Sequence, residues 1–170
     1  MTRSVKKPYA SAARPIPAGF LRHPAHLLAL GFGTGCAPIA PGTAGTVLGV
    51  LVYLALQAVP ALWYLVVTVV LFGVGVLLCH RAAEALGTHD HPAIVWDEVV
   101  GYLVAMTAAP DGWAWVLLGF VLFRAFDIFK PWPIRTIDAR VSGGMGIMLD
   151  DAVAGLYAFL IMQVTGYLTH

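Results

Sequence analysis

Residues 61–79 read Ala61-Leu-Trp-Tyr-Leu-Val-Val-Thr-Val-Val-Leu-Phe-Gly-Val-Gly-Val-Leu-Leu-Cys79 and contain no charged side chain. A helix needs about 20 consecutive apolar residues to cross the hydrocarbon core of a bilayer. This stretch has nearly that length, and it belongs to a longer run, residues 23–80, without Asp, Glu, Lys or Arg. The sequence therefore predicts a membrane helix here.

The composition of the whole chain agrees with a membrane protein. Hydrophobic residues make up 59% of the 170 residues and charged residues 11%, whereas about a quarter of a soluble domain is charged. A net charge of +1 gives no electrostatic case for nucleic-acid binding. Cys36 and Cys79 lack metal-ligand spacing, so we interpret both as small buried hydrophobic residues and not as a disulfide or a nucleophile.

Other apolar stretches flank this one and are separated by turn residues. We expect an all-α, multi-helix integral membrane protein with about five membrane helices arranged in hairpins. The turns of the hairpins are Pro60 and Pro110-Asp111-Gly112. The expected helices cover residues 47–59, 61–79, 99–110, 113–123 and 152–168.

Charge distribution predicts the domain organisation and the topology. Residues 1–25 are expected to be a flexible basic N-terminal tail, and residues 26–170 a single helical membrane domain. If the tail is cytoplasmic, all ten Lys and Arg residues and eight of the nine acids fall on the cytoplasmic side. We expect a multi-pass protein of the bacterial inner membrane whose acidic site faces the cytoplasm.

Two acidic pairs, Asp97-Glu98 and Asp150-Asp151, each precede an apolar stretch that contains a glycine. The glycine lies four residues after Asp97 in the first stretch and four residues after Asp151 in the second. These glycines are Gly101 and Gly155, and glycine lets membrane helices approach closely. Close helices can bring carboxylates onto one shared cation, and hard oxygen ligands favour Mg²⁺, Ca²⁺ or Mn²⁺. The alternative is that each pair only interacts with the dipole of its helix.

The expected helices 99–110 and 113–123 are too short to span a bilayer alone. If they span, they extend to about residues 93 and 130, and the charged residues at their ends lie below the membrane surface. These residues are Asp97, Glu98, Arg124 and Asp127. The alternative is that the helices do not span and that these charges lie in water.

Basic and hydroxyl side chains near the acids are candidate phosphate ligands. They are Lys130, Arg124 and Arg135, together with Gly42, Thr43 and Thr46 in a glycine-rich stretch expected to be a loop. Topology and lipid-headgroup contact are the alternative explanation for the basic residues. His89 and Asp90 are further candidates, although Asp90 could simply cap a helix, and we expect Asp138 on a solvated loop.

Four segments in this order resemble the phosphatidylglycerophosphatase A family over residues 24–168. They are Gly31-Phe-Gly-Thr-Gly with Pro41-Gly-Thr-Ala-Gly, Ile94-Val-Trp-Asp-Glu-Val-Val-Gly101, Arg124-Ala-Phe-Asp-Ile-Phe-Lys-Pro-Trp-Pro-Ile-Arg135 and Gly144-Met-Gly-Ile-Met-Leu-Asp-Asp-Ala-Val-Ala-Gly155. The resemblance implies a Mg²⁺-dependent phosphoric monoester hydrolase of phospholipid biosynthesis. Its substrate would be the membrane lipid phosphatidylglycerophosphate, and its products phosphatidylglycerol and inorganic phosphate.

The resemblance also implies which acids form the site. Asp97, Glu98, Asp127, Asp150 and Asp151 would hold the metal, and Asp97, Asp127 and Asp150 would also act in catalysis. Motifs for a cysteine or an Asp-x-Asp nucleophile are absent, which favours hydrolysis by water with a metal ion and a carboxylate base.

Three other classes of membrane protein fit the same residues less well. A transporter or cation channel would use intramembrane carboxylates, but polar residues should then occur along several helices. A phosphatidyl transferase would need a longer motif after Asp111-Gly112 than the sequence has. A non-catalytic scaffold would not explain the paired acids.

Overall fold

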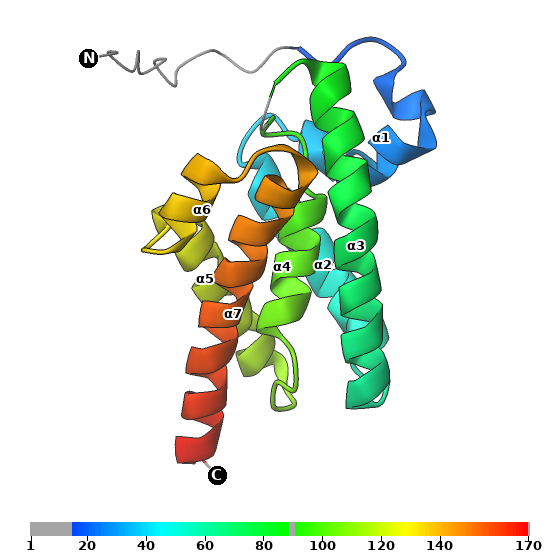
Figure 1. Cartoon of the computed structure of the whole chain (residues 1–170). Helices are drawn as coiled ribbons and strands as arrows, with labels where there is room; N and C mark the ends of the chain where they lie inside the picture. Colours follow the sequence, from blue (N-terminus) through cyan, green and yellow to red (C-terminus); the bar gives the residue numbers. More distant parts are fainter. Residues whose placement is uncertain (1–14, 89–90, 170) are drawn as a thin grey trace, which may run out of the picture.

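The computed structural model describes residues 15–88 and 91–169, and this part of the chain is helical with no strand. Figure 1 shows long helices running roughly side by side, with the short ones gathered at one end. The short elements are η1 (Phe20–Arg22), α1 (Pro24–Ala29), η2 (Gly31–Cys36) and α6 (Ile134–Arg140). The longer ones are α2 (Pro41–Leu56), α3 (Ala61–Leu86), α4 (Trp96–Ala105), α5 (Trp113–Phe129) and α7 (Gly143–Thr169).

Helix α4 is the centre of the bundle. It contacts α2, α3, α5 and α7, and eight of its ten residues are buried. Ten residues of α-helix measure about 15 Å, half the thickness of a hydrocarbon core. Because other helices surround α4, its short length does not expose its polar ends to lipid.

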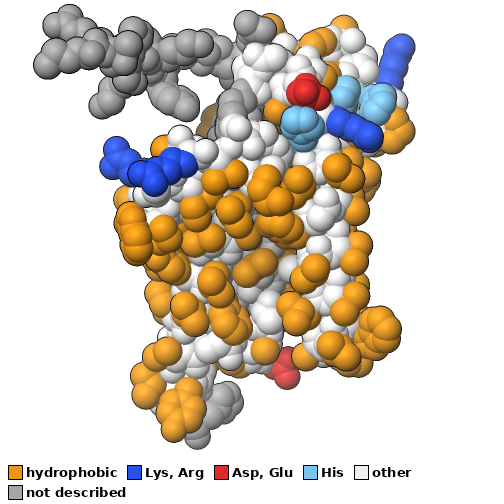
Figure 2. Space-filling model, in the orientation of Figure 1, with side chains coloured by type: hydrophobic (Ala, Val, Ile, Leu, Met, Phe, Trp, Pro, Cys, Tyr) orange, Lys and Arg blue, Asp and Glu red, His pale blue; other side chains and the backbone are white. Residues whose placement is uncertain are grey.

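The outer helices present an apolar surface of the kind that a bilayer would cover. Figure 2 shows hydrophobic side chains over the middle of the molecule and most of the visible charged side chains at one end. Within residues 15–88 and 91–169, two helices are long and apolar enough to cross a membrane: α3 with 26 residues and α7 with 27. Exposed large side chains on them include Leu62, Val69 and Val164. These features fit a membrane protein.

Helices α4 and α7 approach closely at the two glycines singled out in the sequence. A β-carbon on Gly101 would lie 2.6 Å from the Phe123 ring and 2.8 Å from the backbone oxygen of Asp151. A β-carbon on Gly155 would collide with the backbone oxygen of Gly101. The expected helix contact through glycine is therefore present, and it places Asp97-Glu98 beside Asp150-Asp151.

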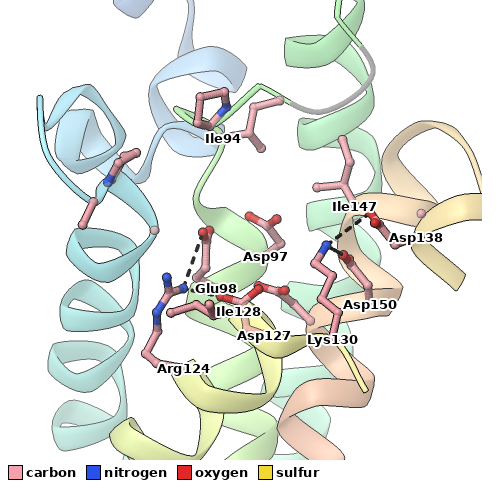
Figure 3. A pocket seen from close by; sticks show the side chains of 16 residues that line it. Ile94, Asp97, Glu98, Arg124, Asp127, Ile128, Lys130, Asp138, Ile147 and Asp150 are labelled. Carbon is pink, nitrogen blue, oxygen red and sulfur yellow. Dashed lines mark hydrogen bonds and ion pairs between the residues drawn. The ribbon is translucent and has the colours of Figure 1, made fainter. Parts of the chain in front are cut away.

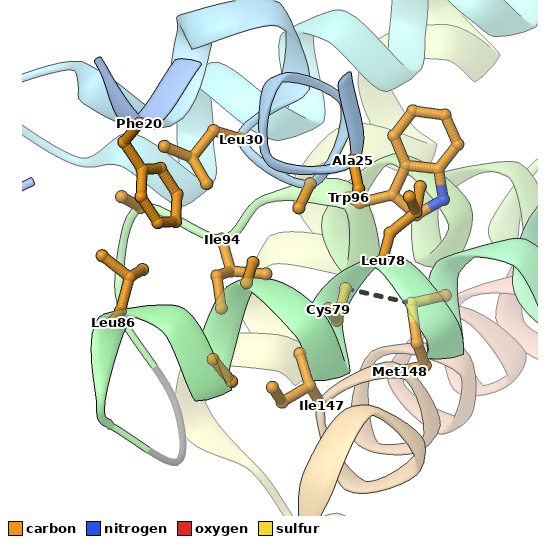
Figure 4. Close-up of a cluster of buried hydrophobic side chains, with 14 of the residues drawn as sticks. Phe20, Ala25, Leu30, Leu78, Cys79, Leu86, Ile94, Trp96, Ile147 and Met148 are labelled. Carbon is orange, nitrogen blue, oxygen red and sulfur yellow. Dashed lines mark hydrogen bonds between the residues drawn. The ribbon is translucent and has the colours of Figure 1, made fainter. Parts of the chain in front are cut away.

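Two apolar clusters hold these helices together on either side of the acids. The first, shown in Figure 4, packs Phe20 and Leu30 against the end of α3 and the start of α7, with Met148 at its edge. The second surrounds Tyr102 and Phe123 and includes Ala154 of α7. Asp150 and Asp151 follow Met148 and precede Ala154, so they lie between two packed regions.

All five expected membrane helices are present as helices, but several boundaries differ from the predictions. Helix α7 begins at Gly143, so Asp150 and Asp151 lie two turns inside it and do not open it. Helix α5 continues to Phe129, as the spanning interpretation required. Helix α4 begins at Trp96 and not at about residue 93, and Pro92 lies in the turn before it.

Three segments expected to be irregular are partly helical. Thr43 and Thr46 lie in α2 and not in a loop, because α2 begins at Pro41. Asp138 lies in α6. Within the expected tail 1–25, Phe20 is buried and stacks on His26 with ring centroids 4.0 Å apart. The rest of that tail, residues 1–14, lies outside the described residues.

Candidate functional site

A cavity of about 390 Å³ opens at the charged end of the bundle, where α2, α4, α5, α6 and α7 converge. Figure 3 shows carboxylates and basic groups from α4, α5, α6 and α7 pointing into it. Its polar lining consists of Asp97, Glu98, Arg124, Asp127, Lys130, Asp138, Asp150 and Asp151. The five acids predicted to form the site therefore all line one cavity.

Three carboxylates form the centre of the cavity. One oxygen each from Asp97, Glu98 and Asp151 lies within 4.8 Å of the other two. Asp97 is 8% exposed and Asp151 3%. Like charges at this separation and burial disfavour one another unless protons or a cation neutralise them.

The donor set fits a divalent cation. Among the described residues, Glu98 Oε2 and Asp151 Oδ2 are buried and accept no hydrogen bond. Buried polar atoms in proteins nearly always have a partner, so these two oxygens are suited to bind a cation. Clustered carboxylate oxygens without histidine or cysteine favour a hard cation such as Mg²⁺, Ca²⁺ or Mn²⁺ over a softer one such as Zn²⁺ or Cu²⁺.

Arg124 connects the carboxylate cluster to α5. Its guanidinium forms an ion pair with Asp127, one turn along the same helix, and lies 3.9 Å from Glu98 Oε1. The Arg124 Nε atom is buried and donates to none of the described residues. The Arg124–Asp127 ion pair therefore faces the cavity.

Lys130 supplies a second cation on the other side of the cavity. Its ammonium donates to Asp150 Oδ2 at 2.6 Å and lies 3.2 Å from Asp138 Oδ1 (Figure 3). Burial by itself lowers the pKa of this lysine, but the charge and hydrogen bond of Asp150, with a smaller effect of Asp138, raise the pKa overall. Lys130 is therefore positively charged at neutral pH.

The backbone conformation of Lys130 places this side chain. Lys130 ends α5 in the left-handed conformation, with φ 42°, which costs a non-glycine residue roughly 1 kcal/mol or more. Pro131 follows and prevents the helix from continuing. The chain turns sharply there into α6, which brings Asp138 to the cavity.

The start of α2 closes the opposite wall. Gly42 lines the cavity, and a β-carbon there would collide with the Glu98 carboxylate and lie 3.1 Å from the Arg124 guanidinium. The absence of a side chain therefore lets the first turn of α2 approach both groups.

The remaining predicted residues lie elsewhere. Thr46 is fully buried and its hydroxyl donates to the Gly42 carbonyl at 2.9 Å. Thr43 is half-buried and does not line the cavity, and Arg135 is exposed on α6 outside it. His89 and Asp90 lie outside the described residues. Asp138 was missed because its contact with Lys130 depends on the turn between α5 and α6.

A cavity of clustered carboxylates and two cations at the charged end of an apolar helix bundle is the arrangement expected of a membrane enzyme that acts on a phosphorylated substrate. Comparison with known proteins identifies the family. The model of the family described as Phosphatidylglycerophosphatase A matches residues 27–165. The chain belongs to this family, and it is a phosphatase.

Individual relatives agree over most of their length. A protein of Escherichia coli (strain K12) named Phosphatidylglycerophosphatase A is 46% identical over 150 residues, which cover 86% of each chain. A protein of the same name from Haemophilus influenzae is 45% identical over 152 residues, 86% of this chain and 91% of its own.

A third relative bears a different name. It comes from Bacteroides thetaiotaomicron, is provisionally named a phosphatidylinositol-3-phosphatase, and is 38% identical over 145 residues, 81% of this chain and 91% of its own. No solved structure matches the chain.

Proposed function

We propose that this protein is a phosphatidylglycerophosphatase, which removes the terminal phosphate monoester of phosphatidylglycerophosphate and leaves phosphatidylglycerol and inorganic phosphate. One observation carries the proposal: three carboxylates converge within 4.8 Å beside Arg124 and Lys130, in a chain of this family. The two most similar relatives described above carry that name.

The metal in this proposal is Mg²⁺, with Asp97, Glu98 and Asp151 as its protein ligands. Asp127 and Asp150 line the same cavity and complete the acidic site. When bound, Mg²⁺ supplies positive charge for the phosphate oxygens and for the charge that develops during their displacement. The unpartnered oxygens of Glu98 and Asp151 support this assignment.

Arg124 and Lys130 are the phosphate-binding cations of the proposed reaction. An arginine can hold two phosphate oxygens with its planar guanidinium, and a lysine acts as a point charge. Each cation already has a carboxylate partner, Asp127 for Arg124 and Asp150 for Lys130, which orients it before substrate arrives. Orientation of this kind contributes to catalysis because the charges do not have to reorganise.

Asp150 is the proposed proton acceptor because it lies outside the group of three that would hold the metal. A water oxygen bonds to phosphorus while the phosphorus–oxygen bond to glycerol breaks. Asp150 takes the proton that the water loses, the leaving glycerol oxygen takes up a proton from solvent, and Asp150 then returns its proton to solvent. Asp97 contributes to catalysis by holding the metal, and Asp127 contributes by holding Arg124.

The proposed location is the bacterial inner membrane, crossed several times, with the cavity at the cytoplasmic face. Cys79 is buried as expected, but Cys36 is exposed, four residues before the cavity wall. Pro60 is exposed in the turn between α2 and α3. In intact cells, a membrane-impermeant thiol reagent should label Pro60→Cys in a Cys36→Ser background and should not label Cys36 of the unmodified chain. The reverse pattern would overturn the orientation.

The function is tested by phosphate release from two lipids in detergent micelles. Purified protein with Mg²⁺ should hydrolyse phosphatidylglycerophosphate and should hydrolyse phosphatidylinositol 3-phosphate more slowly. Faster release from the inositol lipid would change the proposed substrate. Release from neither lipid by folded protein would contradict the proposed function.

A further inference from the structure

An apolar edge borders the polar cavity on the α5 side. Ile128 lines the cavity, yet it is 64% exposed. Phe129 and Trp132 follow it and are also exposed. On the α2 side, Ile39 is exposed directly before Ala40, which lines the cavity. We call Ile39, Ile128, Phe129 and Trp132 the apolar rim.

The rim is held in a defined position. Tyr157 of α7 donates a hydrogen bond to the Trp132 carbonyl at 3.1 Å, and its ring packs edge-on against Phe126 of α5. Ile134, two residues after Trp132, is fully buried. The side chains of Phe129 and Trp132 therefore project outward from a corner whose backbone is anchored to α7.

Charge beside the rim indicates where it lies relative to a membrane. Arg135 and Arg140, three and eight residues after Trp132, are exposed on α6. Exposed aromatic side chains next to arginines are typical of the lipid-headgroup level, where rings contact the acyl boundary and cations contact phosphates. The rim therefore matches the boundary between the apolar surface of the bundle and its charged end.

The cavity and the rim share one face of α5. Arg124 and Ile128 are four residues apart and both line the cavity, so their side chains lie one above the other. Figure 3 shows Ile128 beside the Arg124–Asp127 pair. A molecule that reached Arg124 from this side would have its phosphate at the cations and its next atoms against Ile128.

From these positions we propose that the cavity opens sideways to the bilayer between the start of α2 and the end of α5, and that the diacylglycerol part of the lipid substrate binds against Ile128 and Phe129. The inference rests on the proposed function and adds the binding site for the apolar part of the substrate. Ile128 and Phe129 then determine specificity for a lipid phosphate over a water-soluble one. The occupant is the substrate itself because the polar end of the same opening bears the phosphate-binding cations.

The test compares two substrates that share one headgroup. One is phosphatidylglycerophosphate in micelles, and the other is its deacylated, water-soluble form, glycerophosphoglycerophosphate. Loss of part of an isoleucine contact corresponds to about a fivefold to tenfold weaker interaction. Ile128→Ser should therefore lower kcat/KM about fivefold to tenfold more for the lipid than for the soluble compound, mainly through KM. Ile128→Val should keep most of the wild-type kcat/KM for the lipid.

Val121→Ser is the matched control. Val121 lies two turns earlier on the same face of α5, is 61% exposed and does not line the cavity. This variant should leave the ratio of the two kcat/KM values unchanged. An equal effect of Ile128→Ser on both substrates, or an equal effect of both variants on the lipid, would overturn the proposal.

A second readout does not depend on hydrolysis. A fluorophore on Phe129→Cys, in a Cys36→Ser background, should be quenched more by phosphatidylglycerophosphate with brominated acyl chains than by phosphatidylcholine with the same chains. Equal quenching by both lipids would overturn the proposal. If quenching is selective but no phosphate is released, the proposed reaction fails while the lipid-binding rim stands.

Discussion

Gly101→Ala tests whether the contact between α4 and α7 sets the geometry of the metal site. The new β-carbon would lie 2.8 Å from the Asp151 backbone oxygen, whereas ordinary contacts begin at 3.4 Å, so that backbone must move by about 0.6 Å. The neighbouring Phe123 ring is fully buried and cannot move aside freely. Metal–ligand distances tolerate only about 0.2 Å.

The expected result is a defect in metal use. Disturbing the groups that orient metal ligands typically costs about 10–100-fold in metal affinity. The Mg²⁺ concentration that gives half-maximal phosphate release should therefore rise at least about tenfold in Gly101→Ala. Overpacking also costs about 1–3 kcal/mol of stability, so thermal unfolding in detergent should be measured beside the activity.

Gly73→Ala makes the same chemical change on α3, where a β-carbon would meet nothing within 4 Å. Alanine favours a helix over glycine by about 1 kcal/mol, so this control should keep both its stability and its Mg²⁺ dependence. A folded Gly101→Ala protein with the Mg²⁺ dependence of the wild type would refute the reasoning. So would an equal rise in Gly73→Ala.

Three further predictions concern the cavity. Lys130→Gln should raise KM for the lipid about tenfold or more in steady-state assays, since a charge-assisted contact of about 1.5–3 kcal/mol is lost; an unchanged KM would contradict its phosphate role. Gly42→Ala should lower kcat/KM because the added carbon displaces Glu98 and Arg124, whereas Ala44→Gly, in the same helical turn but not lining the cavity, should have a smaller effect. Mg²⁺ in place of EDTA should raise the unfolding temperature of the wild type by relieving carboxylate repulsion, and an identical temperature would argue against a bound cation.

The sequence predicts the helices and the acids of the site for identifiable reasons. The spacings from Asp97 to Gly101 and from Asp151 to Gly155 each place an acid and a glycine on one helix face. Glycine spacing therefore predicts both that the helices touch and that their acids meet. Hydropathy predicts the positions of all five long helices because their outer or buried faces are apolar.

Other features depend on contacts that no local pattern reports. Helix α7 begins eight residues before Asp151 because its first turns pack in the cluster around Met148. In the sequence, the two charged residues interrupt the apolar pattern, so that pattern does not show that the helix extends back past them. Asp138 reaches the cavity only because Lys130 takes a left-handed conformation and α6 folds back. Thr46 lies in a glycine-rich stretch, but its hydroxyl is satisfied within its own helix.

The central claim is that carboxylates from α4 and α7 together hold a divalent cation that the phosphatase reaction requires. It is tested most directly by phosphate release from phosphatidylglycerophosphate, with Mg²⁺ and with EDTA, for the wild type, Asp97→Asn and Asp151→Asn. We predict Mg²⁺-dependent release by the wild type and its loss in both variants while they remain folded. Release that persists in EDTA, or in either folded variant at the wild-type Mg²⁺ dependence, would contradict the claim.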